Sequence, residues 1–344
     1  MPEKRVSGRN GIGKQVDARD RRAFEAASRG IGVATLSLTA YRGDRHDEID
    51  GNVPHCRAAR IRFGRSRRGR RRAATGRRDR AGMNPLSSLI RFARAPAVWV
   101  PEYARAARVE WRGARVTVRD VRNFRYRTRD DCVPAYYDAT FALDAVTTVD
   151  LVVSRWTAEA IAHVFLSFGL DDGRYVAISI ETRRRHGQRY SPYAGFLPLY
   201  DLVYVVADER DLIGVRSDVR KERVYLFRAH VTSDTARALF ADYLRRVHAL
   251  EHRPEFYNTL FNNCTTNILR HVRAVAPDVG YSWMVLLSGY ADRYGHDLGL
   301  LDASMPFDAL KTASLIRRPP GATIDGDFSA AIRASLPLAR TYAK

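Results

Sequence analysis

Two apolar runs joined by a short turn place the strongest constraint on how this chain can fold. Residues 161–170 (IAHVFLSFGL) and 174–181 (RYVAISIE) are rich in β-branched and aromatic side chains, and Asp171, Asp172 and Gly173 separate them. A turn of this composition between two strand-like runs is a strong hairpin signal. The sequence therefore predicts two neighbouring antiparallel strands.

The same turn predicts which side chains face each other. If it is centred on Asp172, the numbers of paired residues sum to 344, and 163 plus 181 is 344, so His163 lies opposite Glu181. Directly opposed residues point to the same face of a sheet, with Cβ atoms about 5 Å apart. A shift of one residue would put the two side chains on opposite faces. The hairpin therefore predicts a histidine–carboxylate pair.

Other periodic runs predict an α+β fold with a mainly antiparallel sheet packed against helices. Alternating apolar residues predict further strands at residues 114–119, 123–127, 149–153, 202–206 and 224–227. A polar loop is expected between the last two of these strands. Helical spacing predicts one helix from Ser233 to just before Pro254 and another from Cys264 past Val272. Strands followed by helices, without regular alternation, favour α+β over a doubly wound sheet.

The N-terminal quarter has a different composition. Residues 1–82 contain 22 Lys and Arg against 9 Asp and Glu, which is +13 of the formal net charge of +20. Half of the 24 residues from Arg57 to Arg80 are arginine, so no packed core is expected there and the segment should be disordered. It is interpreted as a solvated tail, as an arm for nucleic acid or anionic lipid, or as a non-native segment that precedes a true start at Met83. Residues 83–106 are expected to be a linker or the start of the mature region.

The cysteine count and the hydropathy argue against several classes of protein. Three cysteines, Cys56, Cys132 and Cys264, are too few for a disulfide framework and lack the paired spacing of structural zinc sites. No run approaches the ~20 apolar residues that span a bilayer. The start also lacks the layout of a signal peptide. No RNP-like or helix-turn-helix pattern accompanies the basic residues, so nucleic acid is not an expected partner of the domain.

One motif suggests a metal site. His248, Glu251 and His252 form HxxEH, which in inverzincin metalloproteases places two zinc ligands one helical turn apart, with a glutamate base. Here the motif lies at the end of an amphipathic surface helix, and the sequence offers no third ligand. Neither a metal nor another cofactor is therefore expected.

A cysteine at the start of a helix is the strongest candidate for chemistry. Cys264 faces the unpaired N–H groups and the positive end of the helix dipole, which favour a thiolate nucleophile. His163 would be its base, and Glu181 would orient the imidazole. The expected oxyanion or supporting donors are Asn262, Asn263 and Thr265. The alternative interpretation makes Cys264 a small buried hydrophobe and His163 a satisfied core histidine.

Several strings resemble one bacterial family in the order in which they occur. They are VRNFRYRT (121–128), IAHVFLSFGLDDG (161–173), ISIETRR (178–184), ADERDLIGVRSDVR (207–220), VYLFR (224–228), FYNTLFNNCTTNI (256–268) and GDFSAAIRASLP (326–337). Together they resemble the Lnb N-terminal periplasmic domain family over Ala107 to Pro337. The domain itself is placed at residues 107–340.

This resemblance implies a function and a location. It implies kinship with lipoprotein N-acyltransferases, whose cysteine carries an acyl chain from a lipid to a lipoprotein. It also implies a papain-like fold similar to permuted NlpC/P60 enzymes, with Cys264 as nucleophile, His163 as base and Glu181 as orienter. The expected partners are a lipid acyl donor or a lipoprotein or peptide substrate, at a membrane surface in the periplasm or on the inner membrane. A thiol amidase or peptidase and a non-catalytic envelope binding domain remain alternatives.

Overall fold

The predicted hairpin forms with the predicted register. In the computed structural model β7 (His163–Leu170) pairs antiparallel with β8 (Tyr175–Arg183). Leu166 lies opposite Ile178, so the paired numbers sum to 344 as predicted. Gly173 takes a φ of 81° in the turn, a conformation that glycine adopts without steric cost.

The structure describes residues 97–129, 131–156, 158–188, 195, 197–319 and 321–337. The expectations for residues 1–82, and those for residues 83–96 of the linker, lie outside this described part.

The hairpin lies inside a mixed eight-stranded sheet. Its path runs β1-β2-β9-β8-β7-β6-β10, and β5 also pairs with β2. The β2–β9 pairing is parallel and the other pairings are antiparallel. The strands not yet introduced are β1 (Arg108–Arg112), β2 (Arg115–Arg122), β5 (Tyr136–Ala142), β6 (Val146–Arg155), β9 (Asp201–Ala207) and β10 (Arg223–Arg228), with β3 (Arg125–Tyr126) and β4 (Cys132–Val133) as a separate pair. The α+β prediction is confirmed.

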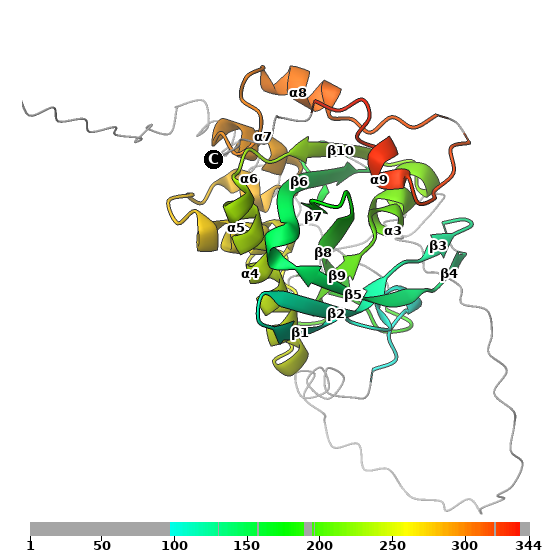
Figure 1. Ribbon diagram of the computed structural model, residues 1–344. Helices are drawn as coiled ribbons and strands as arrows, with labels where there is room; N and C mark the ends of the chain where they lie inside the picture. Colours follow the sequence, from blue (N-terminus) through cyan, green and yellow to red (C-terminus); the bar gives the residue numbers. More distant parts are fainter. Residues whose placement is uncertain are drawn as a thin grey trace, which may run out of the picture. The chain divides into compact units, whose positions relative to one another are not determined.

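Helices cover both faces of this sheet. The long helices α4 (Ser233–His252) and α5 (Cys264–Val275) pack on one face, where Leu166, Phe168 and Ile178 join their core. On the other face Phe165 and Ala177 pack with residues of α3 (Glu209–Gly214) and α9 (Phe328–Ala331). Figure 1 shows the two helix layers on opposite sides of the strands. The alternation of side chains along each strand therefore separates two cores.

One sequence prediction is wrong. The segment between β9 and β10 was expected to be a polar loop, but it forms α3 and the helical segment η5 (Val215–Val219). The many polar residues of this segment favoured a loop, but Leu212 and Ile213 among them are fully buried against the sheet. Burial of that apolar stripe stabilises a helix whose charged residues find partners inside the fold.

The remaining helices are short and mostly follow α5. They are η2 (Pro101–Tyr103), η3 (Leu143–Ala145), α6 (Trp283–Leu286), η6 (Ser288–Tyr290), α7 (Ala291–Asp297) and α8 (Phe307–Ala313).

Candidate functional site

Cys264 is the first residue of α5, as predicted. The preceding residue, Asn263, caps the helix: its side chain accepts a hydrogen bond from the Thr266 N–H, and its own N–H donates to the Thr266 hydroxyl. This reciprocal capping box pins the first turn of the helix. Cys264 is buried, with 7% of its surface exposed. Its sulfur is therefore held at a rigid helix N-terminus.

His163 lies at the start of β7 and meets a carboxylate and a hydroxyl from β8. Its Nε2 is 3.2 Å from Oε1 of Glu181 and 2.6 Å from the Ser179 hydroxyl. The Ser179 hydroxyl donates to the same Oε1 at 2.7 Å. The hydroxyl thus accepts from the ring and donates to the carboxylate, so Glu181 holds the ring both directly and through Ser179.

The thiol of Cys264 reaches the same imidazole. The β7–β8 ladder ends at the pair Leu166 and Ile178, so the strands separate before His163 and Glu181. Cys264 belongs to the same apolar cluster as Ile178, on the face of the sheet that α4 and α5 cover. In this arrangement the Cys264 thiol is one of the groups that raise the pKa of His163. The thiol and the imidazole are therefore electrostatically coupled.

The surroundings of His163 favour its protonated form. Burial lowers its pKa, but the charge of Glu181 and the hydrogen bonds with Cys264 and Glu181 outweigh burial and raise the pKa from 6.5 to about 9. The same contact acts on Glu181: burial raises the pKa of the carboxyl, but His163 and Arg216 hold it well below its usual range. At neutral pH the pair is therefore an imidazolium and a carboxylate.

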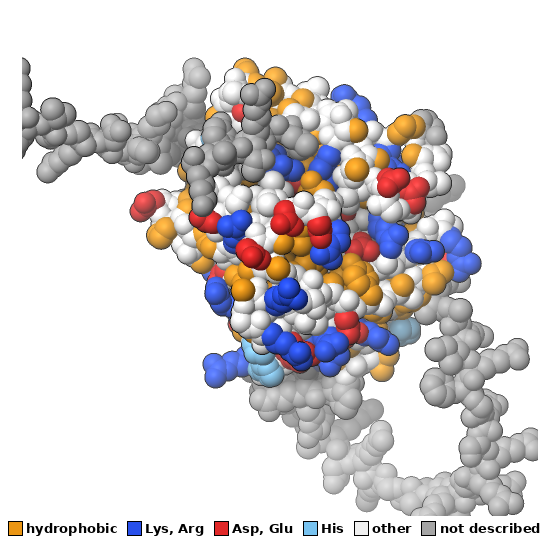
Figure 2. Space-filling view, viewed as in Figure 1, with side chains coloured by type: hydrophobic (Ala, Val, Ile, Leu, Met, Phe, Trp, Pro, Cys, Tyr) orange, Lys and Arg blue, Asp and Glu red, His pale blue; other side chains and the backbone are white. Residues whose placement is uncertain are grey.

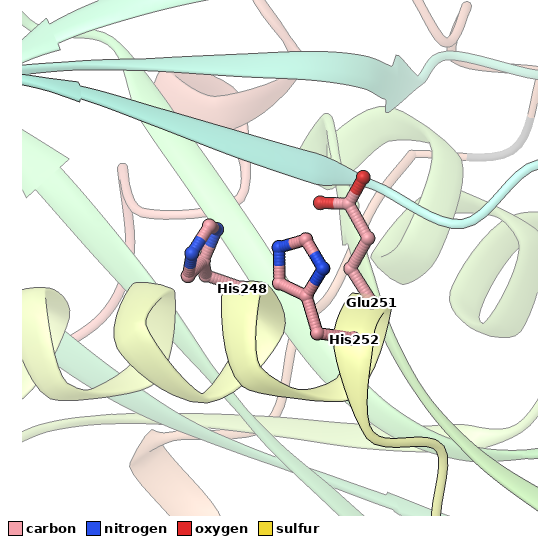
Figure 3. Close-up of side chains that lie close together, drawn as sticks. All are labelled: His248, Glu251 and His252. Atoms are coloured by element: carbon pink, nitrogen blue, oxygen red, sulfur yellow. The ribbon is translucent and has the colours of Figure 1, made fainter.

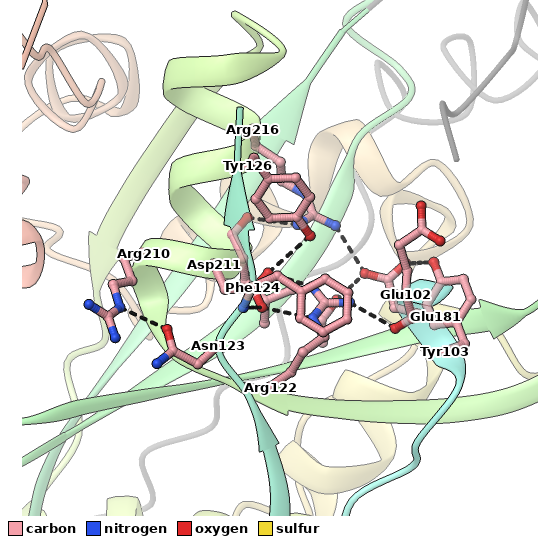
Figure 4. A network of polar contacts seen from close by, with 12 residues as sticks. Glu102, Tyr103, Arg122, Asn123, Phe124, Tyr126, Glu181, Arg210, Asp211 and Arg216 are labelled. Carbon is pink, nitrogen blue, oxygen red and sulfur yellow. Dashed lines mark hydrogen bonds and ion pairs between the residues drawn. The ribbon is translucent and has the colours of Figure 1, made fainter. Parts of the chain in front are cut away.

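Two further side chains orient Glu181. The Tyr103 hydroxyl donates to Oε2 at 3.1 Å, and Arg216 donates to Oε1 at 2.9 Å. Figure 4 shows both pointing toward the carboxylate. Arg216 is itself held by the backbone carbonyl of Leu212 at 2.7 Å. Both oxygens of Glu181 are thus fixed by donors from η2, β7, β8 and η5.

A second buried ion pair supports this arrangement. Arg122 forms two bonds with Asp211, of 2.9 and 2.8 Å, and donates to the backbone carbonyl of Glu102. Tyr126 also donates to Asp211, as Figure 4 shows. The pair ties β2 and α3 to the turn that carries Tyr103. Because Tyr103 donates to Glu181, the pair supports that carboxylate indirectly.

The predicted oxyanion donors have their side chains engaged elsewhere. The Asn262 amide donates to the Phe256 carbonyl, the Asn263 amide donates to the Thr259 carbonyl, and the Thr265 hydroxyl donates to the Val285 carbonyl. In the part of the chain that the structure describes, no acceptor meets the N–H groups of Cys264 and Thr265. Those backbone groups are the donors available to an oxyanion beside the sulfur.

A buried relay holds the loop that precedes Cys264. Asp242 lies 2.7 Å from Nδ1 of His271, whose Nε2 lies 2.9 Å from the Tyr204 hydroxyl. Tyr204 contacts Asn267, which donates to the Asn263 carbonyl at 2.8 Å. Burial lowers the pKa of His271 to about 4, so its ring is neutral. The relay positions the loop and is not a second acid–base site.

An apolar cavity of about 130 Å³ adjoins the site on the α5 face of the sheet. Thr265, next to the nucleophile, and Val164, next to His163, line it together with Leu166 and Leu269. Nearly all of its other lining residues are aliphatic. The cavity offers space for a hydrocarbon group on the α5 face, and the sequence neighbours of Cys264 and His163, rather than those two residues, line it.

The structure brings Cys264, His163 and Glu181 together, whereas sequence reasoning missed three residues beside them. Ser179 lies two residues before Glu181 on the same strand face, so strand alternation could have identified it. Tyr103 and Arg216 carry no comparable signal, because they come from segments distant in sequence.

Comparisons with known proteins identify a family over part of the chain. Residues 133–289 match the family model described as the Lnb N-terminal periplasmic domain, a narrower range than the resemblance of Ala107 to Pro337. The match contains Cys264, His163 and Glu181. No curated protein and no solved structure matches the chain. Among the described residues, no helix has both the length and the apolar character needed to cross a membrane.

Proposed function

We propose that this chain, which carries the Lnb N-terminal periplasmic domain at residues 133–289, is a thiol-dependent acyltransferase or acyl hydrolase of the bacterial envelope. Cys264 is the nucleophile, His163 the acid–base group, and Glu181 the residue that orients the imidazole. The observation that carries the proposal is the His163 imidazole, which Ser179 and Glu181 hold through Nε2 and whose pKa the Cys264 thiol helps to raise.

The first half of the reaction forms an acyl-enzyme. The Cys264 sulfur, whose proton His163 holds, attacks the carbonyl carbon of an acyl ester. The carbon–oxygen bond to the leaving group breaks, and the His163 imidazolium gives its proton to the departing alkoxide. The acyl chain is then bound to Cys264 as a thioester, and the N–H groups of Cys264 and Thr265 stabilise the oxyanion formed on the way.

The second half transfers the acyl chain. Neutral His163 takes a proton from an amine or a water molecule, which attacks the thioester carbonyl. The carbon–sulfur bond breaks, and the thiolate beside an imidazolium is restored. An amine acceptor makes the protein a transferase, and water makes it a hydrolase. No cofactor takes part in either step.

The apolar cavity supports a lipid acyl chain as the group transferred. It lies beside Thr265, and aliphatic side chains form nearly all of its wall. A peptide substrate would instead need polar groups to pair with its backbone amides, because unpaired buried amides are costly. A periplasmic domain family is consistent with a donor and an acceptor at the envelope.

The proposal also includes a papain-like relationship. A cysteine at the N-terminus of a helix that packs against an antiparallel sheet, with its histidine on a strand, is the arrangement expected of a permuted NlpC/P60-like enzyme. The order His163, Glu181, Cys264 along the chain supports the permuted form.

Acyl labelling tests the function. The full chain is incubated with phospholipid vesicles that carry a labelled acyl chain, and the adduct is located by mass spectrometry. We expect one hydroxylamine-sensitive acyl group on Cys264, and formation about 100-fold slower or more in His163→Gln, since a general base contributes roughly 10²–10⁴-fold. His186→Gln, an exposed histidine, is the matched control and should label at the rate of the unaltered chain.

Other outcomes would contradict the proposal. Hydrolysis of a peptide amide without lipid labelling would identify an amidase. If neither reaction occurs and iodoacetamide modifies Cys264 equally fast with and without His163, the domain is a non-catalytic binding module.

A further inference from the structure

The HxxEH motif lies outside the site described above. His248, Glu251 and His252 occupy the last turns of α4, and one ligand atom from each lies within 4.8 Å of the other two. Figure 3 shows the two imidazole rings side by side on the helix, with Glu251 next to them. We propose that these three side chains form a surface site for a divalent transition-metal ion, with Zn²⁺ as the ion that the donor set fits best.

The spacing along the helix makes the three donors convergent. Residues at i, i+3 and i+4 lie on one face of a helix, here His248, Glu251 and His252. Zinc bonds to imidazole nitrogen and carboxylate oxygen are about 2.0–2.2 Å long, so two donors of one ion are at most roughly 4 Å apart. Small side-chain rotations would close the remaining gap. The structure places the Glu251 carboxylate close enough to both imidazoles to be the third ligand, whereas the motif by itself suggests only a glutamate base.

The structure also prepares one ligand for binding. Nδ1 of His248 lies 3.1 Å from the backbone carbonyl oxygen of Val109 on β1. A carbonyl can only accept, so Nδ1 carries a hydrogen, and in the neutral ring Nε2 is the nitrogen with a free lone pair. Histidine ligands of metals commonly have their second nitrogen fixed in this way. His248 is thereby oriented before any ion arrives.

Two features at this end of α4 favour a cation. The motif ends α4, where the carbonyl end of the helix dipole is negative, and Glu251 adds a full negative charge. Glu251 and His252 are exposed, so an ion can reach them from solvent. Figure 2 shows histidine side chains at the surface beside this end of α4.

Two imidazole nitrogens and one carboxylate suit zinc better than calcium or magnesium, which prefer oxygen ligands. The ion would fix the His248 ring, whose Nδ1 already contacts the Val109 carbonyl of β1. Strand β1 is an edge strand, and β2 and β9 separate it from β8 and the Cys264 site. The inferred role is therefore stabilisation of this edge, independent of acyl transfer.

Zinc titration of the full chain tests this site. Cys264→Ser is used as the background, so that the thiol cannot bind the ion, and Zn²⁺ binding is measured by calorimetry and by the thermal midpoint. We expect binding that becomes at least about tenfold weaker in His252→Ala and in Glu251→Gln. The control His186→Ala removes an exposed histidine elsewhere and should leave binding unchanged.

The thermal midpoint separates this site from other zinc-binding groups. Zn²⁺ should raise the midpoint of the background protein and of His186→Ala, and raise it less in His252→Ala. Equal affinity in the background protein and in His252→Ala would overturn the proposal. So would the absence of binding in the background protein.

Discussion

Replacing Glu181 by glutamine tests how the candidate site sets the charge of His163. The substitution keeps the shape of the side chain but removes the charge that lies 3.2 Å from Nε2. Arg216, whose positive charge lowers the pKa of His163, would then lose its ion-pair partner, and no carboxylate at position 181 would offset that charge. Both effects disfavour the imidazolium.

The expected magnitude follows from the pKa of His163. Its rise from 6.5 to about 9 corresponds to about 3 kcal/mol in favour of the protonated form, at about 1.4 kcal/mol per pKa unit. Among the causes that raise the pKa, the charge of Glu181 is the largest, ahead of the hydrogen bonds with Cys264 and Glu181. We therefore expect the pKa of His163 to fall by at least about one unit in Glu181→Gln, or about 1.4 kcal/mol.

The sign of the stability effect is also determined. A pKa that is higher in the folded state stabilises the fold fully below the unfolded value of 6.5, and this contribution disappears as the pH rises through about 9. The lowered pKa of Glu181 describes the same contact, so the two shifts are counted once. The variant should therefore lose more stability at pH 6 than at pH 10.

The assay is an NMR titration of the histidine ring protons between pH 5 and 10, with His163→Gln to assign the resonance. Urea unfolding at pH 6 and pH 10 measures the stability. Glu110→Gln, which alters an exposed carboxylate on β1, is the matched control and should leave the His163 titration unchanged. A His163 pKa that stays near 9 in Glu181→Gln, or that is already 6.5 in the unaltered protein, would refute the reasoning.

Two further predictions concern the hydroxyl beside His163 and a buried arginine. Ser179→Ala removes one of the two contacts to Nε2 of His163 but keeps the direct contact with Glu181. Acyl-enzyme formation in a single-turnover assay should therefore slow by roughly tenfold, about 1.4 kcal/mol. An unchanged rate would exclude a role of Ser179 in positioning the ring. Arg333→Met removes the guanidinium that bonds the buried carboxylates of Asp150 and Glu209 at 2.7 and 2.6 Å. The free energy of unfolding, measured by urea denaturation, should therefore fall by about 3–5 kcal/mol. The exposed Arg317→Met is its control, and equal stability of the two variants would contradict the prediction.

The C-terminal part of the chain shows why that arginine matters to the fold. Arg333 follows α9 and reaches across the α3 layer to Asp150 on β6 and Glu209 on α3. Both carboxylates are fully buried. The string GDFSAAIRASLP predicts none of this, because the partners lie 183 and 124 residues away.

The sequence by itself determined the local features of this protein. The turn at Asp172 and the alternation on either side of it were enough to predict the β7–β8 register, because strand side chains repeat every two residues and a short turn leaves little choice of pairing. The capped helix that begins at Cys264 was equally local. Helix α3 was missed, because its charged residues become buried only once Arg122 and Arg333 are in place.

Tertiary structure alone decided how the site is assembled. No pattern along the chain indicates that β7 and β8 separate before His163, or that Cys264 meets the imidazole there from the other face of the sheet. Nor does any pattern bring Tyr103 and Arg216 to Glu181. These contacts join segments tens of residues apart, so they depend on how the layers pack rather than on the propensities of each segment.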